Sequence, residues 1–236
     1  MSEPKLLTKS KFRLAMDCPT KLFYADKKEY ANANFDNSFL ASLKDGGFQV
    51  GELARCYFPE GVRVRTQNHE EALRITNELL ASDNIVIFEA AFRHELLFVR
   101  ADIVIKRGDK LELIEVKAKS CDFEDESGFL NKDGTISSDF KQHIYDVAFQ
   151  KFVVQKAFSD LEVKAFLMLA DKTVHCPTDG LNQKFRLTRD EAGRKIVAVS
   201  PELCPDDLTP QILRKINVDA SCEKILVEIG DNGRNF

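Results

Sequence analysis

Three residues in two consecutive apolar segments have types and spacing that could do chemistry. Asp102 lies within the run LFVRADIVIK, and both Glu115 and Lys117 lie within the run LELIEVKAK, which follows a turn. A carboxylate in so apolar a segment is costly to bury unless it is paired or binds a metal. Because side chains alternate along a strand, Glu115 and Lys117 project from one face. Asp102 can approach that face if the two segments pair as a hairpin.

These residue types match the needs of a magnesium site. Magnesium prefers hard oxygen ligands and retains several waters. Asp102, Glu115 and the backbone carbonyl of Val116 can supply such ligands and leave room for a phosphate. Lys117 can position an attacking water and neutralise developing negative charge. Each residue alone has an ordinary explanation, such as an exposed charge pair on a strand, but their joint occurrence predicts cleavage of a phosphodiester with Mg²⁺ or Mn²⁺.

The elements that must position these residues follow from patterns along the chain. Runs of β-branched and aromatic residues predict strands over 85–92, 95–106 and 110–119, the last two forming a hairpin. A helical pattern over 140–158 and an apolar strand over 163–170 come next. The order of helix, three strands, helix and strand predicts an α/β fold with a mixed central sheet flanked by helices.

The regions before and after this core have different patterns. Three helical segments are expected in the first third of the chain: 10–28 broken at Pro19, 39–57 broken at Gly46–Gly47, and 68–81. After a strand near 184–187, the remainder is poorly patterned. A chain of 236 residues can bury one good core. We therefore expect a single domain with a helical N-terminal region over residues 1–83, a catalytic core over 84–172 and a C-terminal extension over 173–236.

Composition limits the partners and the compartment. The formal net charge is -4, so a nucleic acid must be held by a local patch rather than by a global basic field. The first thirty residues have a local excess of basic side chains: Lys5, Lys9, Lys11, Arg13, Lys21, Lys27 and Lys28. An ordinary solvated helix face is an equally good explanation of that excess. With neither a signal peptide nor an apolar run of membrane-spanning length, we expect a cytoplasmic protein without membrane contacts.

The motifs resemble those of a known superfamily. The stretches ADIV and IEVKAKS resemble the second and third motifs of the PD-(D/E)XK nucleases, and DVAFQ places Gln150 where the RecB-like branch carries a helical Gln. That branch includes the CRISPR-associated exonucleases. The sequence is most similar to a bacterial family of RecB-like domains that precede a second domain, through LTKSKFRLAMDCPTKLFY and FQVGELARCYFPEGV. The resemblance covers roughly Leu6 to Phe152 and implies a further domain after residue 236.

The resemblance also implies residue roles. Asp102 and Glu115 would be metal ligands, Lys117 the catalytic lysine, and Gln150 a residue that orients substrate or water. Many relatives carry a helical His where this chain has Gly51, and a Tyr where it has Val154. A fourth acid is therefore expected from one of two residues in the metal site: Glu52, next to Gly51, or Glu89, in the preceding strand.

The cysteines bear on a second cofactor. Some RecB-like proteins bind an iron–sulfur cluster through an N-terminal Cys-Pro and three grouped C-terminal cysteines. Here Cys18 precedes Pro19, but the later cysteines at 176, 204 and 222 are far apart. The spacing argues against a cluster and favours reduced thiols.

Three functions remain compatible with these residues. The first is a metal-dependent nuclease acting on DNA ends or single strands, with the N-terminal basic residues, Arg100, Lys117 and Lys119 near the phosphates. The second is an inactive module of the same fold that binds nucleic acid or a partner domain. The third is a nuclease that prefers RNA, because nothing in these residues reads the 2′-OH.

Overall fold

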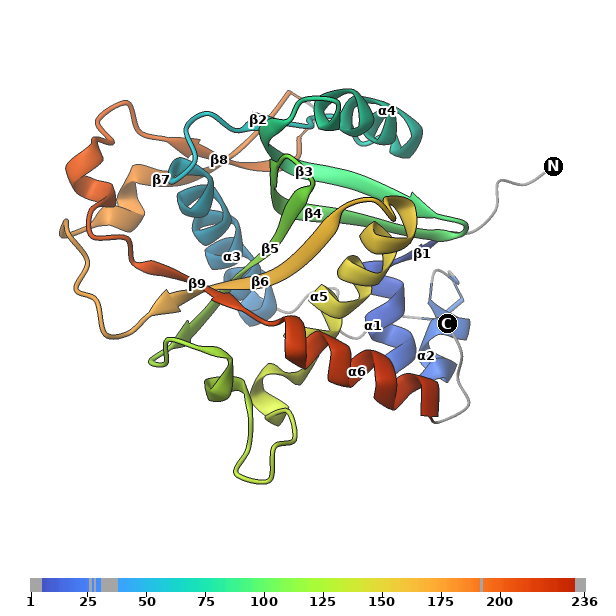
Figure 1. Ribbon diagram of the computed structural model, residues 1–236. Helices are drawn as coiled ribbons and strands as arrows, with labels where there is room; N and C mark the ends of the chain where they lie inside the picture. Colours follow the sequence, from blue (N-terminus) through green and yellow to red (C-terminus); the bar gives the residue numbers. More distant parts are fainter. Residues whose placement is uncertain (1–5, 26, 28, 31–37, 192, 232–236) are drawn as a thin grey trace.

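The molecule is organised around a mixed central sheet. The computed structural model describes residues 6–25, 27, 29–30, 38–191 and 193–231. Its 7-stranded sheet has the order β2-β3-β4-β5-β6-β9, with β1 added on β4 (Figure 1). The strands of this sheet are β1 (Leu7–Thr8), β2 (Val62–Arg63), β3 (Asn84–His94), β4 (Leu97–Arg107), β5 (Lys110–Cys121), β6 (Glu162–Asp171) and β9 (Leu213–Asn217). β5 runs parallel to β6, whereas β3, β4 and β5 are successively antiparallel.

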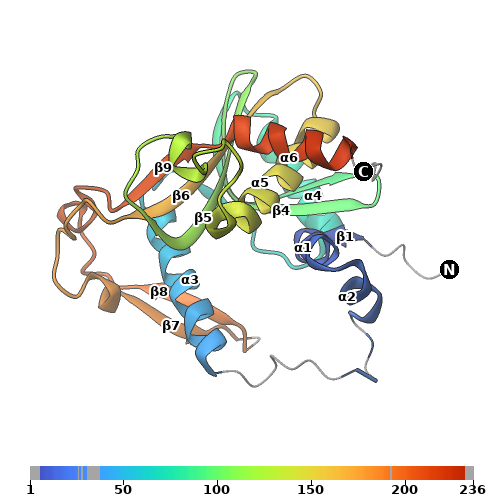
Figure 2. The same ribbon diagram turned by 90° about the horizontal axis from the view of Figure 1, so that it is seen from below.

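Helices cover both faces of this sheet. They are α1 (Lys9–Asp17), α2 (Pro19–Tyr24), α3 (Ser38–Cys56), α4 (His69–Leu80), α5 (Ser138–Ala157) and α6 (Asp219–Asp231). On one face, α5 packs against the sheet with α1 and α6, whereas α3 lies on the other face beside a small separate sheet of β7 (Phe185–Arg189) and β8 (Lys195–Val199) (Figure 2). The predicted α/β class and the mixed sheet flanked by helices are therefore confirmed.

The predicted core elements are present, and local chemistry explains their ends. β4 and β5 form the expected hairpin, whose turn uses Gly108 at a φ of 60°. The break between α1 and α2 falls at Cys18, which is extended at a φ of -163° because it precedes Pro19. Asn68 caps α4 by accepting a hydrogen bond from the backbone N–H of Glu71 at 3.0 Å.

The break predicted at Gly46–Gly47 is wrong, because α3 runs without interruption from Ser38 to Cys56. Each glycine costs about 1 kcal/mol relative to alanine in a helix interior. The C-terminal turns of α3 bury Leu53 and Ala54 against the sheet, and that packing outweighs the local preference. The helix ends at Cys56, one residue before its predicted end.

The C-terminal extension is more ordered than its pattern suggests. Besides the predicted strand, it contains β8, β9 and α6, and β9 completes the edge of the central sheet by pairing with β6. α6 buries Cys222 and Ile225 in the main core. The sequence pattern did not predict these elements, because β8 and β9 have only 5 residues each and because β9 and α6 are stabilised by packing against the rest of the fold.

Two cores lie on the two faces of the sheet. The larger joins the buried face of α5, including Phe149 and Val153, to Leu111 and Leu113 of β5. The smaller lies under α3 and includes Ile114, which follows Leu113 and therefore points to the opposite face. β5 is thus buried on both faces, and its next residues, Glu115 to Lys117, extend from this apolar stretch into the site.

Candidate active site

A fork in the sheet separates β4 from β5 at the candidate residues. β3 pairs with β4 from Leu97 to Arg107 with one interruption, at Asp102, so β1 and β5 must share the opposite edge of that strand. Pairing between β4 and β5 ends at Ile103 and Ile114, and β1 pairs with β4 only at Leu97 and Phe98. The sheet therefore opens between these two pairings, and the chain passes from β1 into α1 at that opening.

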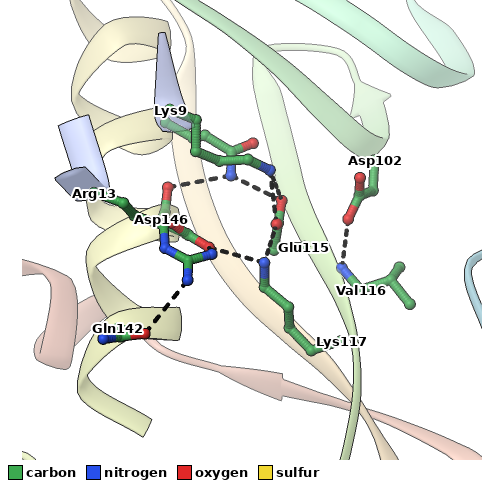
Figure 3. Close-up of polar contacts among 9 residues, drawn as sticks. Lys9, Arg13, Asp102, Glu115, Val116, Lys117, Gln142 and Asp146 are labelled. Atoms are coloured by element: carbon green, nitrogen blue, oxygen red, sulfur yellow. Dashed lines mark hydrogen bonds and ion pairs between the residues drawn. The ribbon is translucent and has the colours of Figure 1, made fainter. Parts of the chain in front are cut away.

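Asp102 lies where the ladder stops. It is the first residue beyond the last β4–β5 pair, and its Oδ2 accepts a hydrogen bond from the backbone N–H of Val116 at 2.8 Å (Figure 3). The side chain thus satisfies a donor that the departing strand leaves without a ladder partner. This contact fixes Asp102 beside the segment from Glu115 to Lys117.

Glu115 is the most heavily bonded acid of the site. Its side chain is 2% exposed and faces α5, as the alternation with Leu111 and Leu113 requires. Oε1 contacts the ammonium of Lys117 at 2.7 Å, and Oε2 accepts a hydrogen bond from Nε2 of Gln150 at 2.8 Å. The structure thus brings together Glu115, Lys117 and Gln150, which come from β5 and α5.

A third side chain on Glu115 was expected only among the basic N-terminal residues near the phosphates, not in the metal site. Lys9, the first residue of α1, donates from Nζ to Oε1 at 2.7 Å and to Oε2 at 2.9 Å. Lys9 follows β1 directly, so the pairing of Leu7 and Thr8 with β4 carries it into the fork. Figure 3 shows Lys9 and Lys117 converging on the same carboxylate.

Asp146 is a second residue that sequence reasoning missed. It lies one helical turn before Gln150 on α5, is 1% exposed, and contacts Nζ of Lys117 at 2.8 Å through Oδ2. Arg13 of α1 lies 3.5 Å from the same oxygen. Among the described residues, Oδ1 of Asp146 has no hydrogen-bond partner. An acid within the otherwise apolar, inward-facing stretch of this helix was the signal that could have found it.

The two candidate fourth acids lie on the α3 side of the fork. Glu52 on α3 pairs with Arg55 at 2.5 Å and with Arg63 at 3.4 Å. Arg55 also pairs with Glu89 at 2.7 Å, so one guanidinium links both acids. Glu89 adopts a φ of 58°, and the β3–β4 pairing is interrupted between Phe88 and Ala90. Such a backbone is strained for a non-glycine residue and turns Glu89 toward α3.

A cavity connects these acids to Asp102. It measures about 200 Å³ and is lined by residues that include Glu52, Arg55, Glu89, Asp102 and Val116. β8 closes one side of the cavity with Lys195, Ile196 and Val197. The C-terminal extension therefore contributes to the site, although its sequence showed no functional motif.

Burial and charge alter the titration of the central groups. Burial, followed by the negative charge of Glu115, raises the pKa of Asp102 to about 7. Burial alone would raise the pKa of Glu115, but the ammonium groups of Lys9 and Lys117 hold it well below its usual range. Burial would lower the pKa of Lys117, but Glu115 and Asp146 keep it above its ordinary value.

Positive side chains gather beside Lys117. Burial, followed by the charges of Lys117, Lys119 and Arg13, lowers the pKa of His143 to about 4. Arg100 does not join this group, contrary to expectation, because it donates to the carbonyls of Val64 at 2.9 Å and of Thr66 at 2.7 Å. Lys5 and Lys28 lie outside the described residues.

The donor chemistry fits a divalent cation at the fork. Asp102 and Glu115 are hard carboxylates close enough for the charge of one to raise the pKa of the other, and a cation between them would relieve that repulsion. The carbonyl of Val116 belongs to the same segment. Within the described residues, no group of three or more His, Cys, Asp or Glu side chains forms a ready metal site. Waters and substrate oxygens would have to complete the coordination.

The chain matches no protein-family model and no curated protein. Across the described residues, no helix has the length and apolar character needed to cross a membrane.

Proposed function

We propose that the protein is a metal-dependent nuclease that hydrolyses phosphodiesters in DNA, with a preference for ends or single strands. One observation carries the proposal: two consecutive strands and a helix bring Asp102, Glu115, Lys117 and Gln150 to the point where the sheet divides. A core of the PD-(D/E)XK type with RecB-like features is the fold family that we infer from the motifs and this arrangement.

The bound metal would supply Lewis acidity toward a phosphate oxygen and ease deprotonation of the attacking water. Asp102, Glu115 and the carbonyl of Val116 would hold it. Mg²⁺ suits these oxygen donors, and Mn²⁺ can replace it. Glu89 is the better fourth acid, because its strained backbone places it beside Asp102 on the neighbouring strand. Glu52 reaches the same cavity from α3.

The other side chains act on the substrate and on one another. Lys117, held between Glu115 and Asp146, keeps its proton and can neutralise charge that develops on the phosphate. Gln150 orients the Glu115 carboxylate through Oε2. Arg13 and Lys119, beside Lys117, provide a cationic path for adjoining phosphates.

The test is cleavage of end-labelled linear single-stranded DNA, linear duplex, closed circular DNA and RNA with Mg²⁺, Mn²⁺ or EDTA. We expect metal-dependent cleavage of linear DNA. Asp102→Ala and Lys117→Ala should each reduce the rate by about 10²–10³. Lys117→Ala should lower turnover more than metal affinity. Lys110→Ala is the matched control, because Lys110 is exposed at the far end of the same strand, and it should leave the rate unchanged.

The outcomes separate the possible functions. Cleavage that survives both site substitutions would rule out this site, and preferential cleavage of RNA would replace DNA as the substrate. Degradation of linear DNA with circular DNA spared would support action at ends.

A binding module without catalysis is the second candidate. It is favoured by one observation: Glu52, Glu89 and Glu115 are all ion-paired with arginine or lysine. Salt-sensitive binding of nucleic acid without cleavage of any substrate would support this function over the first.

A further inference from the structure

We propose that Lys9 is an internal counter-ion that competes with the metal for Glu115, so that metal binding requires the Lys9 ammonium to leave this carboxylate. The inference rests on the proposed metal site and adds a residue of the N-terminal helix that regulates its occupancy. It starts from the crowding around Glu115.

The contacts on Glu115 use its whole capacity to accept hydrogen bonds. A carboxylate offers about four lone-pair directions. Oε1 contacts Lys9 and Lys117, both at 2.7 Å, and Oε2 contacts Lys9 at 2.9 Å and Gln150 at 2.8 Å. A metal ion needs one of these directions, so at least one of the present donors must be displaced.

Of the three donors, Lys9 is the one that the structure leaves able to move. Gln150 is fully buried, and its Nε2 also donates to the carbonyl of Asp146 at 3.1 Å. Lys117 has a second acid, Asp146, at 2.8 Å. The described partners of Lys9 are the two oxygens of Glu115, and its side chain is 24% exposed, against 19% for Lys117.

The backbone around Lys9 would stay in place during this exchange. Leu7 and Thr8 pair with β4. Phe12 is buried and stacks on Phe149 with ring centroids 4.4 Å apart. Because Lys9 is anchored on both sides, the movement is a change of side-chain rotamer rather than undocking of α1. The long, flexible lysine stem makes such a change inexpensive.

Helix stability does not explain why a lysine occupies this position. Lys9 is the first residue of α1, where the helix macrodipole disfavours a positive charge, and the first turn contains no acid. Its compensation comes from Glu115, 106 residues away in the sequence. The Lys9 ammonium therefore neutralises the negative charge of the Glu115 carboxylate. Without it, burying that charge in the absence of metal would cost free energy of folding.

The first test measures Mn²⁺ affinity without nucleic acid, by isothermal titration calorimetry and by electron paramagnetic resonance of free Mn²⁺. Lys9→Met keeps the length and the apolar stem but removes the competing charge, so it should bind Mn²⁺ about tenfold more tightly than wild type. Lys9→Arg keeps the charge and should remain close to wild type. Lys21→Met, which removes a surface lysine paired with Asp17, is the matched control.

The second test uses the unaltered protein, which guards against a Lys9→Met variant that fails to fold. Mass spectrometry would follow acetylation of individual lysines by an amine-reactive reagent, with and without Mn²⁺. Metal should raise the rate at Lys9 severalfold and leave the rate at Lys21 unchanged. A rate at Lys9 that is unchanged or falls with metal would overturn the inference.

The results distinguish this inference from the proposed function. Tighter Mn²⁺ binding by Lys9→Met with no cleavage of any nucleic acid would retain the counter-ion and reject the nuclease. Metal-dependent cleavage with equal or weaker Mn²⁺ binding by Lys9→Met would retain the nuclease and reject the counter-ion. Absence of Mn²⁺ binding in both wild type and variant would also overturn the counter-ion.

Discussion

The two faces of the sheet hold their acids in different ways. On the α5 face, Glu115 is 2% exposed and lies among two lysines and a buried glutamine. On the α3 face, Glu52 and Glu89 are 16% and 28% exposed and share the guanidinium of Arg55 beside an open cavity. Asp102 lies at the fork between the two arrangements.

This difference separates a fixed half of the site from an adjustable half. The α5 half is assembled from α1, β5 and α5, and its charges are balanced deep in the protein, where interactions are strong and the loss of a partner is costly. The arginine pairs of the α3 half are partly solvated and can exchange partners at low cost. We therefore expect the α5 half, apart from the movable side chain of Lys9, to set geometry and the α3 half to adapt to substrate.

The largest expected effect tests this contrast through stability. Glu115→Gln keeps the shape of the side chain but leaves Lys9 and Lys117 without their shared acid, and should lower the free energy of unfolding by about 3 kcal/mol. Glu52→Gln makes the same change on the α3 side and should cost about 1 kcal/mol or less. Urea unfolding in EDTA measures both. Equal losses would remove the distinction between the two halves.

The same contrast explains which residues could be predicted from the sequence. Asp102, Glu115 and Lys117 interrupt apolar strands, and strand alternation indicates that the last two share a face. Gln150 followed from resemblance to RecB-like nucleases. Each of these signals lies within one local segment, so it does not depend on the tertiary fold.

Lys9 and Arg55 carry no such local signal. Lys9 meets Glu115 across 106 residues, and Arg55 meets Glu89 across 34. Their roles depend on how α1 and α3 pack against the sheet. The pattern of charges along the sequence does not predict which acid a lysine or arginine will pair with. The fork likewise depends on β1 and β5 sharing one edge of β4. Pairing of that kind is a tertiary property that strand propensity does not specify.

A second, smaller effect concerns pH and the α5 half. Among the charges that face His143 are Lys117, Lys119, Arg13 and Glu115, and the folded state holds its pKa at about 4. Between about pH 6.5 and 4 the unfolded chain binds a proton at His143 that the folded state excludes, so acidification lowers stability by about 1 kcal/mol per pH unit at most.

His143→Gln should remove this contribution, so its unfolding free energy should fall less steeply than that of wild type from pH 6.5 to 4.5. Urea unfolding at several pH values measures the difference in slope. Asp102, whose pKa is raised to about 7, contributes the opposite slope throughout this window. Only the comparison of variant with wild type is therefore informative, and parallel curves would contradict a neutral, partly buried His143.

The smallest effect compares two strained glutamates, one in each type of environment. Glu95 has a φ of 51° in the exposed β3–β4 turn, whereas Glu89 has a φ of 58° beside the cavity. Glu95→Gly should stabilise the protein by up to about 1 kcal/mol, because glycine adopts a positive φ without strain. Glu89→Gly relieves similar strain but deprives Arg55 of an ion pair at 2.7 Å, so its net stabilisation should be smaller.

Thermal unfolding and cleavage rates measured together decide the role of Glu89. A slower rate for Glu89→Gly alone would show that Glu89 contributes to cleavage and support it as the fourth acid. Equal stabilisation and equal rates for the two variants would show that Glu89 has no role in cleavage and would leave Glu52 as the fourth acid.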